Sequence, residues 1–314
     1  MIVERRLQLI VNPAAGGGRS TRALPAVERM LRDAGHDLRT TLTTSLSHAD
    51  ELTAQALAEE RIPVAMGGDG IAGRVAGALS ALAPQVGSAG PATDSPPGLM
   101  GVLPGGRGND LCRAVGLPRD PVVACAVLGN GVPRALDLGV VSSTTGEVPF
   151  FGIASIGFDS EVQERVLTSR LPLGQAVYLY GALATVARWR PARFTCRVDG
   201  SAFDVAGWTV AVCNSGIYGG GMRLAPEAST ADGILDVVAI ATSSRGHFLR
   251  TLPKVFRGEH VHDASVSVRQ ARTVELAADR PFRVFADGDP AGVLPCTVTV
   301  RPAAVRVLLP AGVA

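Results

Sequence analysis

The sequence of 314 residues lacks several features that would place it in a common functional class. It contains one lysine, Lys254, so none of its glycine-rich turns carries the lysine of a Walker-type phosphate loop. Its formal net charge is only +2, which is too small for the general basic field that non-specific nucleic-acid binding requires. We therefore expect no nucleic-acid partner.

Paired cysteines and long apolar runs are also missing. The five cysteines are scattered, odd in number and without C-x-x-C spacing, which predicts neither a disulfide framework nor a zinc site and suits a reducing cytoplasm. The apolar run that ends at Asn12 is too short for a signal peptide or a membrane span, and the stretch from Ala176 to Trp189 is interrupted. Any contact with a membrane is expected from its surface.

Three glycine-rich turns stand out instead, at residues 12–20, 67–70 and 104–110. Each follows a short apolar run and precedes a helical pattern, which we interpret as strand, turn and helix. Glycine permits positive φ, removes side-chain bulk and leaves backbone N–H groups pointing at an anionic ligand before a helix. The carboxyl ends of parallel strands share one edge of a sheet, and so the turns predict one ligand site.

The rest of the first half also alternates strands with helices. A helix through Leu52 and Leu57 is expected to begin at a cap formed by Ser47 or Asp50. Residues 84–98 are rich in Pro, Gly and Ser and are expected to form a loose insertion without function. Further helices are expected at 21–34, 71–82 and 111–115, and a further strand at 38–42.

After Asp137 short β-rich segments dominate, interrupted by helical patterns at 161–190 and 243–257. This pattern is typical of an antiparallel β-sandwich with inserted helices. We therefore predict two domains, an α/β domain over 1–137 and a β-sandwich domain over 138–314. The strands are expected at 150–155, 194–198, 208–213, 234–240, 265–268, 274–276, 282–286, 296–300 and 305–309.

The order and spacing of several motifs resemble the diacylglycerol kinase catalytic-domain family, which includes bacterial soluble lipid kinases and sphingosine kinases. The resemblance implies a nucleotide-binding α/β domain of the NAD-kinase and diacylglycerol-kinase type, followed by an antiparallel β-sandwich whose last strand returns to the first domain. The motifs that carry it are Val11-Asn12-Pro13, G-G-D-G at 67–70, G-N-D at 108–110, residues 154–159, residues 218–226, D-G-I-L-D-V at 232–237 and D-G-D at 287–289.

The resemblance also implies a cytoplasmic enzyme of phospholipid metabolism that uses ATP and Mg²⁺ to phosphorylate diacylglycerol or a similar lipid alcohol. A structural Mg²⁺ is implied at Asp232, with backbone oxygens of Ser229 and Ile234. The positions that match the family's nucleotide site are Asn12, Pro13, Ala14, Ala15, Gly16, Thr43, Gly67, Gly68, Asp69, Gly70, Ile71, Ala72, Gly73 and Arg107.

The acceptor hydroxyl needs a general base, and Asp289 occupies the place of the family's base, where glutamate is usual. Asp287 is the second candidate, because two residues separated by one reach the same side of an extended segment. The alternative is an ordinary Asp287-Gly288 turn between strands.

Charge neutralisation is the other requirement of phosphoryl transfer. Arginines replace the missing lysine, and Arg19, Arg74, Arg107 and Arg223 are candidates for phosphate contact, with an exposed surface role as the alternative for each. The carboxylates of Asp69, Asp110, Asp137, Asp159 and Asp232 are candidates either to hold catalytic Mg²⁺ through water or to bind helix ends and loop amides.

The chain departs from the family pattern after G-G-D-G, where Ile71, Gly73 and Arg74 replace a hydroxyl, an amide and a carboxylate, and again at Arg107 and Asp289. Three alternatives therefore remain open beside the lipid kinase. They are a kinase of a non-lipid hydroxyl compound, a regulatory module that binds nucleotide or lipid without turnover, and an NAD-kinase-like enzyme. The oligomeric state is not indicated.

Two further patterns lie near residue 250. Residues 245–257 place apolar side chains among arginines and Lys254, which is typical of a basic amphipathic helix on anionic lipid or of a core helix with a solvated rim. His260 and His262 alternate along an expected strand and are interpreted as surface histidines, because no third metal ligand accompanies them.

Overall fold

The computed structural model describes residues 3–82, 98–168 and 176–312, so the insertion expected at 84–98 lies almost wholly outside them. Contacts between Cα atoms divide the chain into two compact units. Unit 1 contains residues 1–138, 230–232 and 301–314, and unit 2 contains residues 139–229 and 233–300. None of the described helices is long and apolar enough to cross a membrane.

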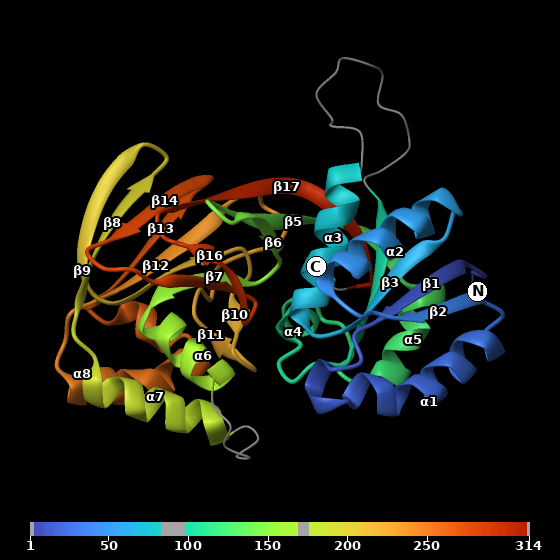
Figure 1. The fold of residues 1–314 in the computed structure, drawn as a ribbon, viewed down its shortest axis with the longest axis horizontal. Coiled ribbons are helices and arrows are strands. Elements are labelled where there is room, and N and C mark those ends of the chain that lie inside the picture. Colours follow the sequence, from blue (N-terminus) through green and yellow to red (C-terminus); the bar gives the residue numbers. More distant parts are fainter. Residues whose placement is uncertain (1–2, 83–97, 169–175, 313–314) are drawn as a thin grey trace. The chain divides into compact units, whose positions relative to one another are not determined.

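Unit 1 is built on a parallel sheet in the order β4, β3, β1, β2. Figure 1 shows α2 and α3 on one face of this sheet and α1 and α5 on the other. The strands are β1 (Arg6–Val11), β2 (Asp37–Leu42), β3 (Ile62–Gly67) and β4 (Leu99–Pro104). The helices are α1 (Arg19–Asp33), α2 (Leu46–Ala58), α3 (Asp69–Leu82), α4 (Asp110–Ala114) and α5 (Pro121–Asn130), with a 3₁₀ turn η1 at Ala15–Gly17.

Local chemistry sets where these helices begin. The Ser45 side chain accepts a hydrogen bond from the backbone N–H of His48 at 3.1 Å and so caps α2. The expectation that Ser47 or Asp50 caps this helix is therefore wrong, because the helix already begins at Leu46. Asp120 caps α5 in the same way, directly before Pro121 at the first helical position.

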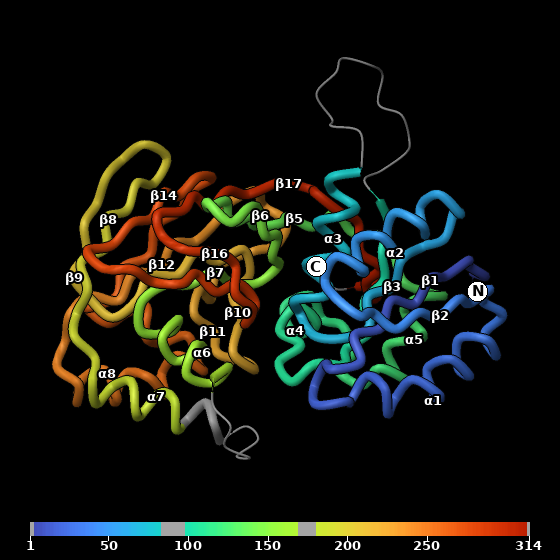
Figure 2. The backbone as a smooth tube through the Cα atoms, in the orientation of Figure 1, coloured from blue at the N-terminus to red at the C-terminus, as the bar shows by residue number. Residues whose placement is uncertain are grey.

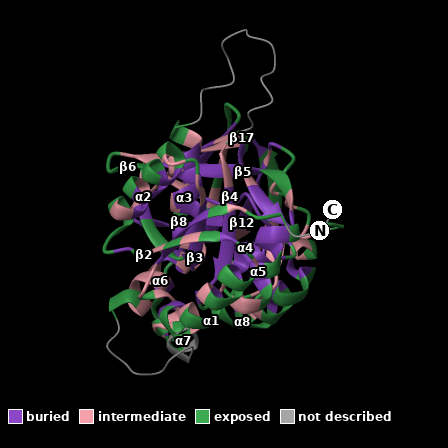
Figure 3. Ribbon diagram, turned by 90° about the vertical axis from the view of Figure 1, so that its right-hand side faces the viewer, coloured by how far each residue is buried: buried purple, intermediate pink, exposed green. Residues whose placement is uncertain are grey.

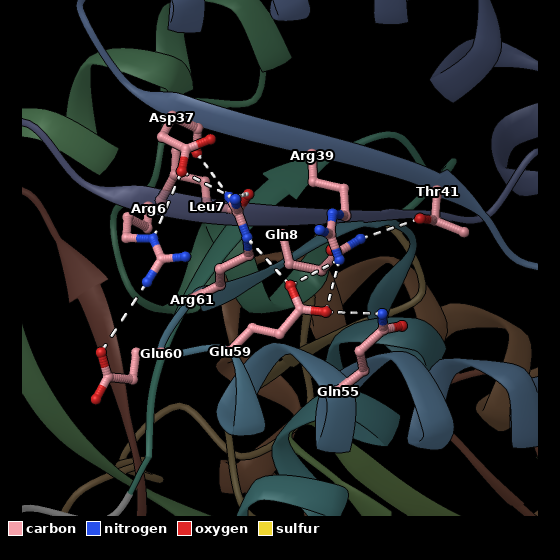
Figure 4. A network of polar contacts seen from close by, with 10 residues as sticks. All are labelled: Arg6, Leu7, Gln8, Asp37, Arg39, Thr41, Gln55, Glu59, Glu60 and Arg61. Carbon is pink, nitrogen blue, oxygen red and sulfur yellow. Dashed lines mark hydrogen bonds and ion pairs between the residues drawn. The ribbon is translucent and has the colours of Figure 1, made fainter.

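A network of charged side chains joins the amino ends of β1, β2 and β3 (Figure 4). The guanidinium of Arg61, whose side chain is only 9% exposed, donates to the Asp37 carboxylate at 2.9 Å and to the Asp37 carbonyl at 3.2 Å. Glu59 accepts from Arg39 at 2.7 Å and lies 3.5 Å from Arg61. This network stabilises the edge of the sheet opposite the glycine-rich turns.

Unit 2 is antiparallel, with β9 as its central strand. The first part of β9 pairs with β8, and its second part lies between β7 and β12. Its strands are β5 (Val132–Ser143, which starts in unit 1), β6 (Gly146–Phe150), β7 (Ile153–Gly157), β8 (Ala192–Val198), β9 (Ser201–Cys213), β10 (Ile217–Tyr218), β11 (Met222–Arg223), β12 (Leu235–Ala241), β13 (Val266–Ala271), β14 (Thr273–Ala278), β15 (Arg283–Ala286), β16 (Asp289–Val293) and the first part of β17 (Cys296–Leu309).

Helices cover part of this sheet: α6 (Phe158–Thr168), α7 (Ala176–Arg188) and α8 (Arg245–Thr251), with 3₁₀ turns η2 (Leu252–Arg257) and η3 (Glu259–His262). The single helix expected over 161–190 is therefore two helices, with residues 169–175 outside the described ones. The helix expected over 243–257 changes to a 3₁₀ helix at Leu252, beside Pro253, because proline supplies no N–H to the α-helical pattern.

The core of unit 2 contains both tryptophans of the chain. Trp208 stacks on Phe248 with ring centroids 4.0 Å apart, and Trp189 and Trp208 stack at 6.0 Å. Both indoles are almost fully buried. Figure 3 shows that most strands are buried, whereas the outer faces of the helices are exposed.

The last strand belongs to both units. Residues Cys296–Thr299 of β17 pair with β14 in unit 2, whereas Arg306 and Val307 pair with β4 in unit 1 (Figure 2). Two strands were expected here, and one continuous strand is found. At the positive φ of Ala303, the Asp137 carboxylate accepts the Ala303 N–H at 2.6 Å, and the Asp137 N–H donates to Thr230 at 2.7 Å. Asp137 thus joins the three segments of unit 1.

Candidate active site

The carboxyl ends of the parallel strands of unit 1 bring together residues that are far apart in the sequence. Val11 pairs with Leu42 on one side and Met66 on the other, and Gly67 pairs with Pro104. The residues that follow these strands therefore share one edge of the sheet. Thr43, predicted as a nucleotide-binding residue, is at this edge, where its N–H and hydroxyl both donate to the Val11 carbonyl at 2.8 and 3.2 Å.

Asn12 holds the first turn in place. Its N–H donates to the Met66 carbonyl at 3.0 Å, its side-chain oxygen accepts from the Ala14 N–H at 3.0 Å, and its carbonyl accepts from the Ala15 N–H at 3.2 Å. The Thr21 hydroxyl donates to the Pro13 carbonyl at 3.2 Å. These bonds position the predicted segment 12–16 against the end of β3.

Some of the glycines let the three turns contact one another. The N–H groups of Gly105 and Gly106 both donate to the Gly67 carbonyl, at 2.6 and 2.9 Å. Gly16 has φ +61°, and a Cβ there would lie 2.5 Å from the Gly105 carbonyl oxygen. A Cβ on Gly106 would lie 2.6 Å from the Cα of Gly68. Side chains at Gly16 and Gly106 would therefore push the turns apart.

Asp69 of the G-G-D-G turn binds the backbone of the third turn. Its two carboxylate oxygens accept the N–H groups of Asp110 and Leu111, at 3.0 and 2.9 Å, and so cap α4. Burial of the carboxyl raises its pKa, against the opposing effect of these two N–H donors. Of the two roles considered for Asp69, the structure shows the binding of loop amides.

Sequence reasoning missed the role of Asn109. This residue has φ +50°, and its side chain folds back onto Gly106, accepting from the Gly106 N–H at 2.8 Å and donating to the Gly106 carbonyl at 3.1 Å. Asparagine tolerates positive φ and carries both a donor and an acceptor, so it closes the turn. The G-N-D motif was the available signal.

The predicted residues at the start of α3 have packing roles. Ile71 is buried, and its Cγ2 atom would lie 2.7 Å from a Cβ placed on Gly67. Ala72 and Gly73 are buried in the same helical turn, and Gly70 is partly exposed. The side chains of Ile71 and Ala72 thus belong to the core beneath the turns.

The arginines near the turns differ in their contacts. Arg107 is exposed, and its Nη2 atom would lie 3.8 Å from a Cβ on Gly17. Arg22 donates to the Gly17 carbonyl at 3.1 Å. Arg19 is exposed at the start of α1. Two guanidinium groups, those of Arg107 and Arg22, therefore lie beside Gly17.

Arg74 lies elsewhere. Its Nε atom donates to both carboxylate oxygens of Asp50 at 2.8 and 3.0 Å, and Nη2 adds a further bond to the same carboxylate. This bidentate pair joins α2 and α3, so the candidate phosphate contact at Arg74 is corrected to a helix-pairing role. Arg223, in unit 2, lines a hollow of about 560 Å³ together with Arg257 and Glu227.

In unit 2, Asp287 and Gly288 form the turn between β15 and β16. Their φ values of +50° and +86° are those of a two-residue hairpin turn, and Ala286 pairs with Asp289 across it. The expectation that the D-G-D segment is extended is therefore wrong. The Asp287 carboxylate turns inward and accepts the N–H groups of Phe151 (2.9 Å), Gly152 (2.9 Å) and Ile153 (3.2 Å).

Asp289 begins β16 and is exposed. A second carboxyl, that of Asp159 in α6, accepts hydrogen bonds from Ser155, from Gln163 at 3.1 Å and from Tyr218 at 3.4 Å. Burial raises the pKa of Asp159. The Gln163 side-chain oxygen would lie 3.8 Å from a Cβ on Gly288, so this cluster adjoins the hairpin turn.

The residues predicted to hold a metal, Ser229, Asp232 and Ile234, follow one another within a short loop before β12, where Gly233 has φ +72°. Among the described residues no three His, Cys, Asp or Glu side chains form a metal-binding group. A metal ion here would therefore depend on one carboxylate and on backbone oxygens.

The prediction of two surface histidines is confirmed for His262, which is exposed, and is wrong for His260. His260 and His262 lie in η3 and not on a strand. His260 is fully buried, and its Nε2 atom donates to the Leu224 carbonyl at 3.0 Å. Burial lowers the pKa of this imidazole, so His260 is a neutral core residue and not a surface histidine.

Two family models match the chain, one in each half. Residues 6–141 match the diacylglycerol kinase catalytic domain, and residues 152–309 match the YegS C-terminal NAD kinase beta sandwich-like domain.

Two curated relatives are similar to this chain over nearly all of its length. A diacylglycerol kinase of Mycobacterium tuberculosis is 35% identical over 309 residues, covering 97% of this chain and 95% of the relative. A probable YegS-like lipid kinase of Stenotrophomonas maltophilia is 30% identical, covering 98% and 97%. The crystal structure of a putative diacylglycerol kinase from Bacillus anthracis has a TM-score of 0.73 at 19% identity and covers 99% of both chains, which shows a shared fold.

Proposed function

Because this chain belongs to the diacylglycerol kinase catalytic-domain family, we propose that it transfers the γ-phosphate of ATP to the hydroxyl of diacylglycerol or a similar lipid alcohol. The observation that carries the proposal is the contact among the three glycine-rich turns at the carboxyl edge of the sheet in unit 1. Open α/β sheets bind ligands at this edge.

The turns fit a polyphosphate because their glycines are of two kinds. Gly16, Gly105 and Gly106 are packed closely and hold the turns together. At Gly17 and Gly68, by contrast, the nearest atoms to an added Cβ lie at 3.8 and 3.6 Å, which is ordinary contact, so packing between the turns does not itself require glycine at these two positions. We propose that ATP binds here, with its phosphates against these two glycines.

Arginine supplies the positive charge that this site needs. The guanidinium of Arg107 lies beside Gly17, and its planar group of donors matches phosphate oxygens. Arg22 is less suited, because one of its nitrogens already binds the Gly17 carbonyl. We therefore assign phosphate contact to Arg107.

In unit 2 the two aspartates of the hairpin take different roles. Asp287 is bound by three backbone N–H groups and positions the turn, whereas the exposed Asp289 is our candidate for the general base. Asp289 would accept the proton of the lipid hydroxyl as the bond between that oxygen and the γ-phosphorus forms. The bond from the γ-phosphorus to the β-phosphate oxygen breaks, and ADP leaves.

Mg²⁺ supplies charge neutralisation at the transferred phosphate or stability to the fold. We propose a structural magnesium ion at the loop where Gly233 has φ +72°, since Mg²⁺ binds oxygen ligands, uses few carboxylates and retains water. Asp232 would contribute its carboxylate, and Ser229 and Ile234 their backbone oxygens. Asp69 and Asp137 instead bind backbone amides.

The test is transfer of radiolabelled γ-phosphate from ATP, with Mg²⁺, to a panel of lipid alcohols in mixed micelles. We expect transfer to one lipid, and a fall of about 10²- to 10⁴-fold in kcat for Asp289→Asn, in the range of a lost general base. Exposed Asp279, changed to Asn, is the matched control. ATP binding without transfer to any lipid would favour the regulatory module or a non-lipid acceptor, and absence of ATP binding would refute the proposal.

A further inference from the structure

The segment that forms α8 and η2 carries only positive charge. Its thirteen residues, 245–257, include four basic residues and no acidic one. Arg245, Arg250 and Lys254 are exposed, and Arg257 pairs with Glu259 at 2.7 Å. The segment therefore presents a net positive face to solvent.

The inner face of the same segment is fixed in the core of unit 2. Phe248 stacks on Trp208, and Val255 is 5% exposed. The outward positions include two large apolar side chains, Leu249 at 39% and Phe256 at 55% exposure. These two apolar side chains flank Arg250 and Lys254 along the chain, and the packed inner face holds them on the surface.

Helix α7 extends this surface. The start of α8 lies close to the end of α7, because Arg245 donates to the carbonyl of Trp189, just after α7, at 3.3 Å (Figure 1). Leu183 of α7 is 51% exposed, and Arg188 at its end is exposed. The second helix thus adds the same two kinds of side chain.

We propose that this face, formed by α8, η2 and the exposed side of α7, docks unit 2 on an anionic lipid bilayer. Apolar side chains enter the interface while neighbouring arginines and lysine pair with lipid phosphates. A second copy of the chain is a poorer occupant, because a two-fold contact would oppose cations to cations. The inference rests on the proposed function, because the lipid substrate of such a kinase lies in a bilayer.

The experiment compares vesicle co-sedimentation of wild type, Arg250→Gln/Lys254→Gln and Leu249→Ser/Phe256→Ser, using phosphatidylcholine vesicles with and without phosphatidylglycerol. We expect wild type to bind the anionic vesicles more tightly. Each lost cation should weaken binding roughly five-fold, so the charge variant, which lacks two, should lose about twenty-five-fold. The apolar variant should also bind more weakly than wild type, and the ratio of the two affinities should be the same at low and high salt concentration.

Arg29→Gln/Arg32→Gln removes the same charge from the exposed face of α1 and should bind like wild type. The proposal would be overturned if the control lost as much binding as the docking variants, or if both docking variants bound vesicles like wild type. It would also be overturned if wild type did not bind vesicles but formed a dimer that dissociates in the charge variant. Transfer to short-chain diacylglycerol in neutral detergent micelles tests the kinase separately, since both docking variants should keep the wild-type rate there. Vesicle binding with the expected losses but without micellar transfer would retain docking and refute the kinase.

Discussion

Removal of the Asp287 carboxylate is predicted to destabilise unit 2. The carboxylate accepts three N–H groups, from Phe151, Gly152 and Ile153, at 2.9, 2.9 and 3.2 Å. All three donors belong to buried residues, two directly before β7 and one at its first position. Without the carboxylate these N–H groups lose their acceptor at a partly buried site.

The size of the effect follows from these contacts. A hydrogen bond to a charged group contributes about 1.5–3 kcal/mol, and an unsatisfied buried donor costs about 1–3 kcal/mol. Because the three bonds share one acceptor group and are not additive, we expect Asp287→Gly to lose about 3–5 kcal/mol. Glycine is chosen because φ at this position is +50°, and Asp287→Ala should lose roughly a further 1 kcal/mol to backbone strain.

Tryptophan fluorescence is a selective assay for this change. Trp189 and Trp208 are the only tryptophans of the chain, and both lie in the core of unit 2. Thermal unfolding followed at this signal should show a Tm lowered by about 6–20 °C for Asp287→Gly. Asp204→Asn, at an exposed position of the same unit, removes the same charge and should leave Tm unchanged.

The result that would refute this reasoning is a wild-type Tm for Asp287→Gly. Such a protein, if it also failed to transfer phosphate, would assign the base role to Asp287 and remove it from Asp289. A lowered Tm in Asp287→Gly with unchanged Tm in Asp289→Asn would instead separate the anchor from the base.

Three further outcomes are expected. Gly106→Ala places a Cβ 2.6 Å from the Gly68 Cα and should weaken ATP binding at least tenfold and cost about 1–3 kcal/mol, measured by calorimetric titration and urea unfolding; wild-type affinity would contradict the close contact. Arg61→Met should lower the urea midpoint, whereas Arg39→Met, at a half-exposed side chain, should change it little. Burial lowers the pKa of His260, so its contribution to stability is complete above about pH 6.5 and is lost as the pH falls from there through its folded pKa; His260→Gln should flatten urea midpoints measured from pH 8 to 5, and an unchanged profile would exclude this histidine.

Most elements could be predicted from the sequence where a short apolar pattern ends in a glycine or a cap. The glycine-rich turns and the β segments of the second half are of this kind, because their signals are local. The long β5 was missed, and β17 was expected as two strands, because residues 301–303 interrupt its apolar alternation. The strand continues there because Asp137 holds the N–H of Ala303.

In the candidate site, too, the sequence predicted some features and not others. Sequence pattern and family resemblance predicted Asn12, Thr43 and the glycines as site residues, and the pairing of the parallel strands places them at one edge of the sheet. Pattern and resemblance could not predict which groups the charged side chains bind. Arg74 was predicted to contact phosphate, but its guanidinium pairs with Asp50. His260 was predicted to be a surface residue, but it is buried and donates to the Leu224 carbonyl.

The sequence by itself therefore determined the class of fold, the glycine-rich turns and the family, because each depends on neighbouring residues or on motif order. Only the tertiary structure decided what the charged groups bind. Asp69 meets amides 41 and 42 positions away, and Asp287 meets amides more than 130 positions away. A carboxylate takes the donors that the fold brings within about 3 Å, and distance along the chain does not predict which these are.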